Sequence, residues 1–240
     1  MNETGRALTR WLIAGGAAVV ALGAAGVLFV YFVLFSHSAP APLALKSPSA
    51  SASAPALTAS GLPGTWKVAA HSVAGYRVRE QLAFLQAPSD AVGRTSQISG
   101  SVTITGSADA LSVSTATFTV DVKSLRSDQQ MRDQRIEILG LESDRFPTAA
   151  FVLSAPVALP STAASGAQFS VSLTGALTLH GTRKTVTIPA QARLTGAEIE
   201  VAGSIAFPWG EFDMQAPNVG GFVTVDPTAT MEFDLLLAKA

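Results

Sequence analysis

One charged cluster in the sequence has the residue types and spacing to hold the polar group of a ligand. Arg132, Asp133 and Arg135 fall within a single helical turn, and guanidinium groups beside a carboxylate form strong charge-assisted hydrogen bonds. The same residues could instead tie a helix to its neighbouring loops, because Asp128 and Arg132 have the i,i+4 spacing of a helical ion pair. The sequence leaves both interpretations open.

Chemistry that depends on cysteine, histidine or paired carboxylates has little support. The chain has no cysteine, which excludes thiol catalysis, thiolate metal sites and disulfides. His37, His71 and His180 lie in separate segments, without metal-ligand spacing and without a GxSxG nucleophile motif nearby. Glu142 and Asp144 follow a predicted helix, where carboxylates more often make turns and solvated surface. We therefore expect no catalytic residue, no metal site and no enzymatic activity.

The overall charge limits the partners that the chain can have. Only 14% of its 240 residues are charged, and the formal net charge is −1. A strongly basic face for nucleic acid is therefore not expected.

The charged cluster lies in a stretch that predicts one short helix, from Ser127 to Gly140. Ser127 and Gln130 have the spacing of a capping box, and Gly140 is suited to end the helix. A lone helix in a chain of strands usually plugs or flanks a sheet, so this helix should mark the open end of one. Three apolar residues fall on one face of the predicted helix: Met131, Ile138 and Leu139.

From Thr65 onward, apolar and polar residues alternate as they do in half-buried strands. Glu80 interrupts the apolar face of one such run. The strands recur every ~10–15 residues with turn signals between them, which is typical of an all-β sandwich or barrel. Long strands in sequential hairpins favour an antiparallel up-and-down barrel of about eight strands, because closure removes exposed edges.

The residues before the strands predict a membrane anchor followed by a linker. The run at 11–35 is uncharged and mostly apolar, and as a helix it would span about 37 Å, more than the ~30 Å hydrocarbon core. Arg6 and Arg10 precede it, so the N-terminus should be cytoplasmic and the remainder should lie outside. A cleaved signal peptide is the alternative. The predicted parts are a cytoplasmic N-terminus, a single transmembrane helix, a disordered Ala/Pro/Ser-rich linker and a barrel, at 1–10, 11–35, 36–62 and 63–240.

Several motifs occur in one order between Gly64 and Leu237. Arg132-Asp133-x-Arg135 is followed by Asp144-x-Phe146-Pro147-Thr148-Ala149-x-Phe151, and then by LTLHGTRKTV at 177–186. The opening Trp66-Lys67-Val68 and the late Ile205-Ala206-Phe207 accompany them. Together these motifs resemble the YceI family of lipid-binding, lipocalin-like proteins.

The resemblance implies a lipocalin-like barrel around an elongated apolar cavity that encloses a polyisoprenoid or another long-chain lipid. On periodicity alone, a solid core filled by these inward side chains is the favoured interpretation, because every barrel needs a core. With the resemblance, we expect eight of them to line the cavity: Phe118, Val120, Phe151, Leu153, Leu177, Leu179, Ile205 and Phe233.

The expected function is that of a membrane-anchored, extracytoplasmic binding protein that carries, stores or sequesters such a lipid. Its partners would be the lipid and the membrane, with no cofactor other than bound lipid. A surface interaction module with a solid barrel, or an enzyme acting on a bound lipid, are the alternatives. The sequence leaves the oligomeric state open.

Overall fold

The computed structural model describes residues 39–46, 61–82, 88–107, 110–195, 197–217 and 223–240. The expected cytoplasmic N-terminus and transmembrane helix, at 1–35, lie outside the described residues. Within the described part of the chain, no helix is both long enough and apolar enough to cross a membrane.

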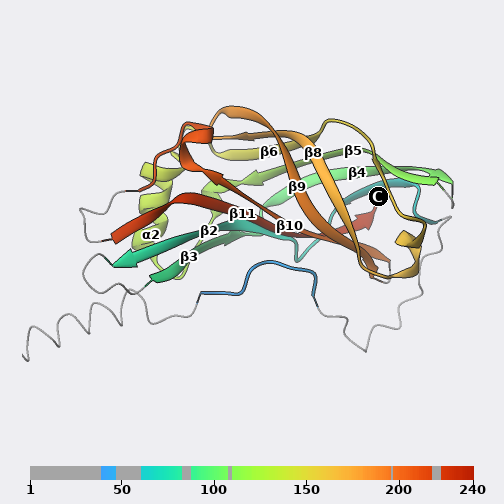
Figure 1. Cartoon of the computed structure of the whole chain (residues 1–240), viewed down its shortest axis with the longest axis horizontal. Helices are drawn as coiled ribbons and strands as arrows, with labels where there is room; N and C mark the ends of the chain where they lie inside the picture. Colours follow the sequence, from blue (N-terminus) through green and yellow to red (C-terminus); the bar gives the residue numbers. More distant parts are fainter. Residues whose placement is uncertain (1–38, 47–60, 83–87, 108–109, 196, 218–222) are drawn as a thin grey trace, which may run out of the picture. The chain divides into compact units, whose positions relative to one another are not determined.

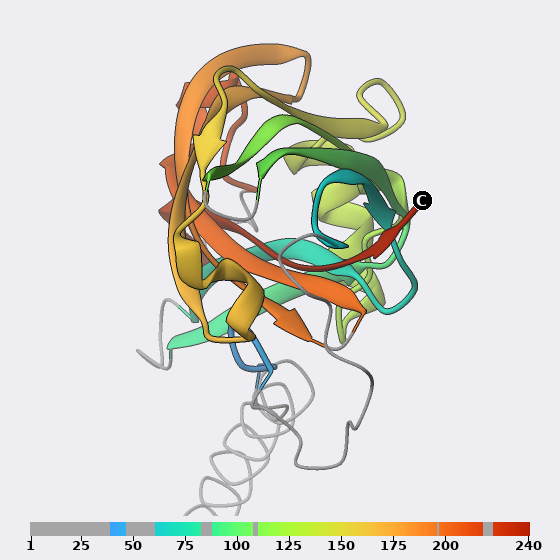
Figure 2. The ribbon, with the colours of Figure 1, turned by 90° about the vertical axis from the view of Figure 1, so that its right-hand side faces the viewer.

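Eight of the described strands form a closed antiparallel barrel, which confirms the predicted fold class. The ring closes at β1, because Trp66 pairs with Val102 on one side and with Lys239 on the other. Figure 2 looks along this ring and shows the strands curving round the interior. In ring order the strands are β1 (Gly64–Val68), β4 (Ile98–Ser107), β5 (Ala110–Asp121), β6 (Thr148–Leu153), β8 (Phe169–Leu179), β9 (Thr182–Thr195), β10 (Glu198–Pro208) and β11 (Val223–Lys239).

A hairpin of β2 (Val73–Leu82) and β3 (Pro88–Thr95) departs from a simple up-and-down order. It lies between β1 and β4 in sequence, yet β2 pairs with the first part of β11. The far edge of β3 joins the chain after β5, where the Arg94 N–H donates to Arg126 O at 2.8 Å and the Arg126 N–H donates back at 3.0 Å. The hairpin therefore continues the wall toward the end of the barrel where α2 (Gln130–Arg135) lies (Figure 1).

The short elements outside the ring lie in its connections. One of them, β7 (Val157–Ala158), pairs with β5. The others are 3-10 helices and one π-helix: η2 (Val122–Ser124), η3 (Ile136–Gly140), η4 (Ser161–Ser165) and η5 (Trp209–Phe212), of which η3 is the π-helix.

The helix occurs where the sequence predicts it, but the predicted cap is wrong. The helix begins after Gln129, and the Ser127 hydroxyl accepts from the Gln129 N–H at 3.2 Å, within the turn before the helix. The Ser127 N–H in turn donates to Asp133 Oδ1 at 2.8 Å. Residues 127–129 therefore form a turn of their own, and this turn moves the helix start past the capping-box position.

The apolar face that the 3.6-residue period singles out is turned to solvent. Met131, Ile138 and Leu139 are 59%, 66% and 52% exposed. Ile136 and Leu141 pack against the apolar core instead. The reason is the π-helix, since the Leu141 N–H donates to Ile136 O at 2.7 Å, an i→i+5 bond that brings residues five apart onto one face.

Four large aromatic side chains lie back against the barrel wall, each over a glycine of the neighbouring strand. A Cβ added to Gly175 would be 2.4 Å from Cζ of Phe151, and one added to Gly203 would be 2.8 Å from Cζ of Phe233. Side chains other than glycine cannot sit under these rings, so glycine lets the rings stay close to the sheet. The four pairs are Tyr76 with Gly93, Phe118 with Gly100, Phe151 with Gly175, and Phe233 with Gly203.

We expect Gly175→Ala to lower the free energy of unfolding by about 1–3 kcal/mol, because the Phe151 ring would have to leave the wall and crowd the interior. Gly210→Ala is the matched control, because no atom of the described residues beyond its chain neighbours lies within 4 Å of its added Cβ, and it should change stability by less than about 1 kcal/mol. Urea unfolding of both variants measures the difference. Equal unfolding midpoints would show that the ring does not depend on the glycine.

Candidate functional site

The interior of the barrel holds an apolar cavity of about 130 Å³. A single water molecule needs only ~10–15 Å³ by the same measure, so the lumen is not filled by its own side chains. Strands on all sides of the ring contribute to the lining, which includes Val102, Phe118, Phe151, Leu177, Leu194 and Phe233.

A second apolar cavity of about 70 Å³ lies beneath the helical segment. Ile136 and Leu141 form part of its lining, together with Trp209 from η5. The two cavities share four lining residues, which are Ala74, Val120, Ala149 and Met231. The two cavities are therefore adjacent, and the second lies on the side of the helical segment.

The structure places most of the predicted lining residues around this interior. The first cavity is lined by Phe118, Val120, Phe151, Leu177 and Phe233, and the second by Val120 and Leu179. Two others, Leu153 and Ile205, are partly buried and pack against the apolar core without lining either cavity. A contact between any of these side chains and a ligand stays a prediction.

Sequence reasoning missed the contribution of the helical segment to the lining. It took lining residues from strands alone, while Ile136 and Leu141 close the second cavity from the helix. A signal was present, because these two apolar residues are five positions apart, which is the period of a π-helical turn.

A buried polar group lies where the apolar interior meets the helix. The hydroxyl of Tyr76 is buried and has no hydrogen-bond partner among the described residues. Tyr76 lines the second cavity and also a small polar pocket of about 10 Å³, which is lined by Asp133 and Ser143 as well. Burial raises the pKa of the Tyr76 hydroxyl against the opposing charge of Arg132, so the group stays protonated and can donate a hydrogen bond.

An ion pair supports this polar end. Glu80 points inward from β2 and lies 3.4 Å from Arg132, measured from Oε2 to Nη2. Burial raises the pKa of the Glu80 carboxyl, and the Arg132 guanidinium limits the rise. The interruption of the apolar face at Glu80 was therefore the sequence signal of this site.

The three residues of the predicted polar cluster, Arg132, Asp133 and Arg135, have different surroundings in the structure. Arg132 pairs with Glu80 and Asp128, so its charge is already compensated. The Asp133 carboxylate accepts from the Ser127 N–H and lines the polar pocket. Arg135 is half-buried and lines none of the three cavities described here. Arg132 and Asp133 thus tie the helix to its surroundings in this structure, and a contact of these residues or Arg135 with a ligand's polar group stays a prediction.

The two histidines of the barrel lie in turns. His180 follows β8 in the turn to β9 and packs against Phe146, with ring centroids 4.4 Å apart. His71 has a positive φ of 68° in the turn between β1 and β2. Across the described residues, no group of three or more His, Asp and Glu side chains could hold a metal ion.

Solved structures with the same fold were found, while the comparison with curated protein sequences gave no match. A polyisoprenoid-binding domain from Saccharophagus degradans, implicated in plant cell wall breakdown, aligns with a TM-score of 0.55 and 16% identity, covering 74% of this chain and 99% of that one. BcnA from Burkholderia cenocepacia aligns with a TM-score of 0.49 and 22% identity, covering 67% and 95%. At these identities, the first alignment shows a common fold.

The sequence itself also matches a family model. The model of the YceI-like domain matches residues 66–237, which extend from β1 into β11, the last strand of the chain. This match covers well over half of the chain and nearly all of the barrel that holds the cavities. The chain therefore belongs to the YceI-like family.

Proposed function

We propose that this protein is a membrane-anchored, extracytoplasmic binding protein that encloses an isoprenoid-type or other long-chain lipid, for carriage, storage or sequestration. The observation that carries the proposal is the pair of adjoining apolar cavities inside a closed barrel. An interaction module would need no open lumen, so the cavities favour a ligand-binding barrel over a solid one. The description of the Saccharophagus degradans domain as polyisoprenoid-binding supports the choice of ligand class.

The physical basis of binding would be burial of apolar chain. Each buried CH₂ group contributes about 0.8 kcal/mol, so a long hydrocarbon chain gains affinity without polar contacts. A lumen walled by aliphatic and aromatic groups selects a ligand by length and width more than by chemistry.

The polar end of the lipid would lie at the helix. The Tyr76 hydroxyl has no hydrogen-bond partner among the described residues, lies beside the second cavity and borders the polar pocket formed with Asp133 and Ser143. A hydroxyl or carbonyl oxygen of a lipid could accept this hydrogen bond and satisfy the group. Because burial keeps the phenol protonated, Tyr76 fits a binding role better than that of a catalytic base.

Thermal unfolding of the delipidated full chain with and without a long-chain polyprenol tests the lipid proposal. Saturating lipid should raise the unfolding midpoint, since ligand at 100 times its Kd adds about 2.7 kcal/mol of stability. Phe118→Ala should reduce this shift, because Phe118 lines the first cavity. Val152→Ala, at a side chain that is 43% exposed, should leave the shift unchanged. The absence of any shift in the parent would rule out polyprenol as a ligand.

Tyr76→Phe should separate the stability role of the hydroxyl from its binding role. Removing an unpaired buried hydroxyl should leave the free energy of unfolding unchanged or raise it, by up to about 1–3 kcal/mol. The same variant should lose affinity for a polyprenol but not for an isoprenoid hydrocarbon of matched length. Titration of both lipids measures this, and an equal loss for the two lipids would contradict a contact with the polar end.

The anchor proposal rests on the apolar run at 11–35 and the two arginines before it. Protease added to intact cells should remove the barrel, and the full-length chain should remain with the membrane after washing with alkaline carbonate. Recovery of a free protein that begins after Ser38 would instead identify the run as a signal peptide.

A further inference from the structure

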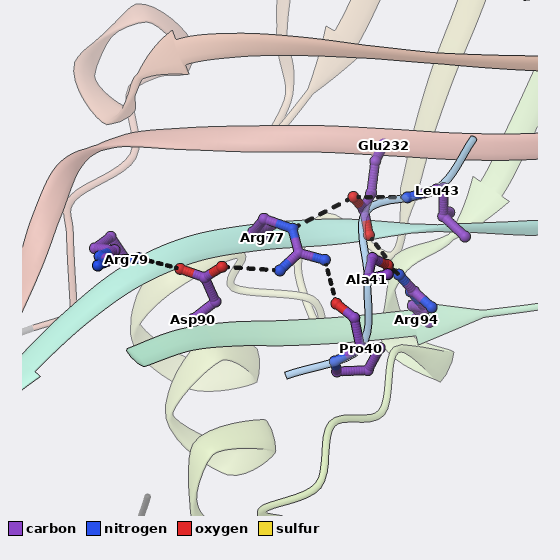
Figure 3. Close-up of polar contacts among 8 residues, drawn as sticks. All are labelled: Pro40, Ala41, Leu43, Arg77, Arg79, Asp90, Arg94 and Glu232. Atoms are coloured by element: carbon purple, nitrogen blue, oxygen red, sulfur yellow. Dashed lines mark hydrogen bonds and ion pairs between the residues drawn. The ribbon is translucent and has the colours of Figure 1, made fainter. Parts of the chain in front are cut away.

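Part of the predicted linker lies on the outer face of the barrel. Residues 39–46, here called the strap, have no regular secondary structure, and Figure 3 shows Pro40, Ala41 and Leu43 passing across β3 and β2 toward β11. Charged side chains of five strands hold the strap and form what we call the outer groove. These side chains are Arg77 on β2, Arg94 on β3, Arg193 on β9, Glu200 on β10, and Glu232 and Asp234 on β11.

Strand alternation explains why these charges lie outside the lumen. On β11, Met231 and Phe233 line the first cavity. Glu232 also borders this cavity, but its carboxylate and that of Asp234 reach the strap, because Glu232 Oε2 accepts from the Leu43 N–H and Asp234 Oδ2 lies 3.8 Å from Lys46 Nζ. With the strap in place, both carboxylates are almost inaccessible, with Glu232 at 1% and Asp234 at 3% exposure. Burying charge is costly unless it is paired and hydrogen-bonded, so the groove is a built site and not a solvated surface.

The groove contacts the strap mainly through its main chain. The Leu43 N–H donates to Glu232 Oε2 at 3.2 Å, and the Lys46 N–H donates to Glu200 Oε1 at 2.9 Å. Arginine side chains bind the strap's carbonyls in turn: Arg77 donates to Pro40 O, Arg94 to Ala41 O, and Arg193 to Lys46 O. The side chains of the groove thus bind both N–H and C=O groups of the strap's backbone.

Ion pairs within the barrel position the groove's side chains independently of the strap. Glu232 lies 3.0 Å from Arg94 and 3.5 Å from Arg77, and Glu200 lies 2.7 Å from Arg193. Each of these carboxylates therefore uses its remaining hydrogen-bonding capacity for a strap N–H. A groove that is organised in this way is ready for an occupant.

The positions of the prolines in the strap are compatible with the hydrogen bonds that the groove makes to its main chain. Pro40 and Pro42 favour an extended backbone and carry no N–H, and the two N–H groups that the groove uses belong to non-proline residues, Leu43 and Lys46. A backbone held extended by proline loses less conformational entropy on binding.

We propose that the outer groove is a binding site for extended, Ala- and Pro-rich polypeptide, recognised through its main chain, and that the strap is its exchangeable occupant. This site lies on the opposite face of the sheet from the lumen, and the proposal does not depend on lipid binding. Because the strap is part of the same chain, its high effective concentration keeps the groove occupied until the strap is weakened.

Leu43→Pro tests release of the strap, since it removes the N–H donor to Glu232 and leaves an uncharged residue. Lys46 is the only lysine or arginine between Arg10 and Lys67, so tryptic cleavage after Lys46 reports the freedom of the strap. We expect about tenfold faster cleavage in Leu43→Pro, as for loss of a hydrogen bond to a charged group. Ala44→Pro, at a residue that makes none of the groove's hydrogen bonds, should be cleaved at the parent's rate.

Exchange is tested by a fluorescently labelled synthetic peptide of residues 39–46, followed by anisotropy. It should bind the full-length Leu43→Pro chain and bind the parent at least tenfold more weakly, because the parent's groove is occupied. The same peptide with proline at position 43 should not bind either chain. Failure of the unmodified peptide to bind a chain whose strap is released, or equal binding of the two peptides, would overturn the proposal.

A folding control keeps the test decisive. The thermal midpoint of Leu43→Pro should stay within a few degrees of the parent, because the strap lies outside the ring of strands. If that variant folds poorly, Lys46→Pro removes the other N–H donor, and peptide binding to it decides the same question by the same criteria.

Discussion

The structure depends on one constraint, which is that the barrel must be apolar inside without being filled. Phe118, Phe151 and Phe233 are large enough to occupy the lumen if they pointed straight across it. Each lies over a glycine of the adjacent strand, and the cavity of about 130 Å³ remains between them. Glycine is needed at these positions because it has no side chain, and a Cβ at any of them would push a ring inward.

The two ends of the interior differ in polarity. At the β1 end, Trp66 is fully buried among aliphatic side chains, and its Nε1–H donates to Leu62 O at 2.8 Å. At the helix end, Tyr76, Glu80 and Arg132 introduce polar groups beside the second cavity. A ligand with one polar end would therefore have a preferred direction in the lumen, with its polar group toward the helix.

The outer face follows from the same alternation that builds the inner one. On β9, β10 and β11, the charged ends of Arg193, Glu200, Glu232 and Asp234 contact the strap, although Arg193 and Glu232 also border the first cavity. The strands thus present two different surfaces, one apolar and enclosed, the other charged and covered by the backbone of the strap. The strap also means that residues 39–46 do not behave as the freely extended spacer that their composition suggests.

The sequence by itself determined the class of fold and the chemical character of the interior. Alternating apolar residues with regular turn signals are sufficient to predict an antiparallel barrel, because strands with one buried face have a period of two. It also located the helix, although the start of the helix moved because residues 127–129 form a separate turn. The inward positions of Phe118, Phe151, Leu177 and Phe233 follow from the same period.

Only the tertiary structure decided which residues of neighbouring strands and segments face one another. Whether the lumen is open depends on which glycine faces which ring, and this is set by strand register, which no local pattern encodes. The π-turn at Ile136 exchanged the buried and exposed faces of the helical segment, because hydrogen bonding to Leu141 overrode the 3.6-residue period. The contact between the strap and the barrel could not be predicted for a similar reason. The strap has the composition of a linker, and its partners are charged residues on five strands that are far away in the sequence.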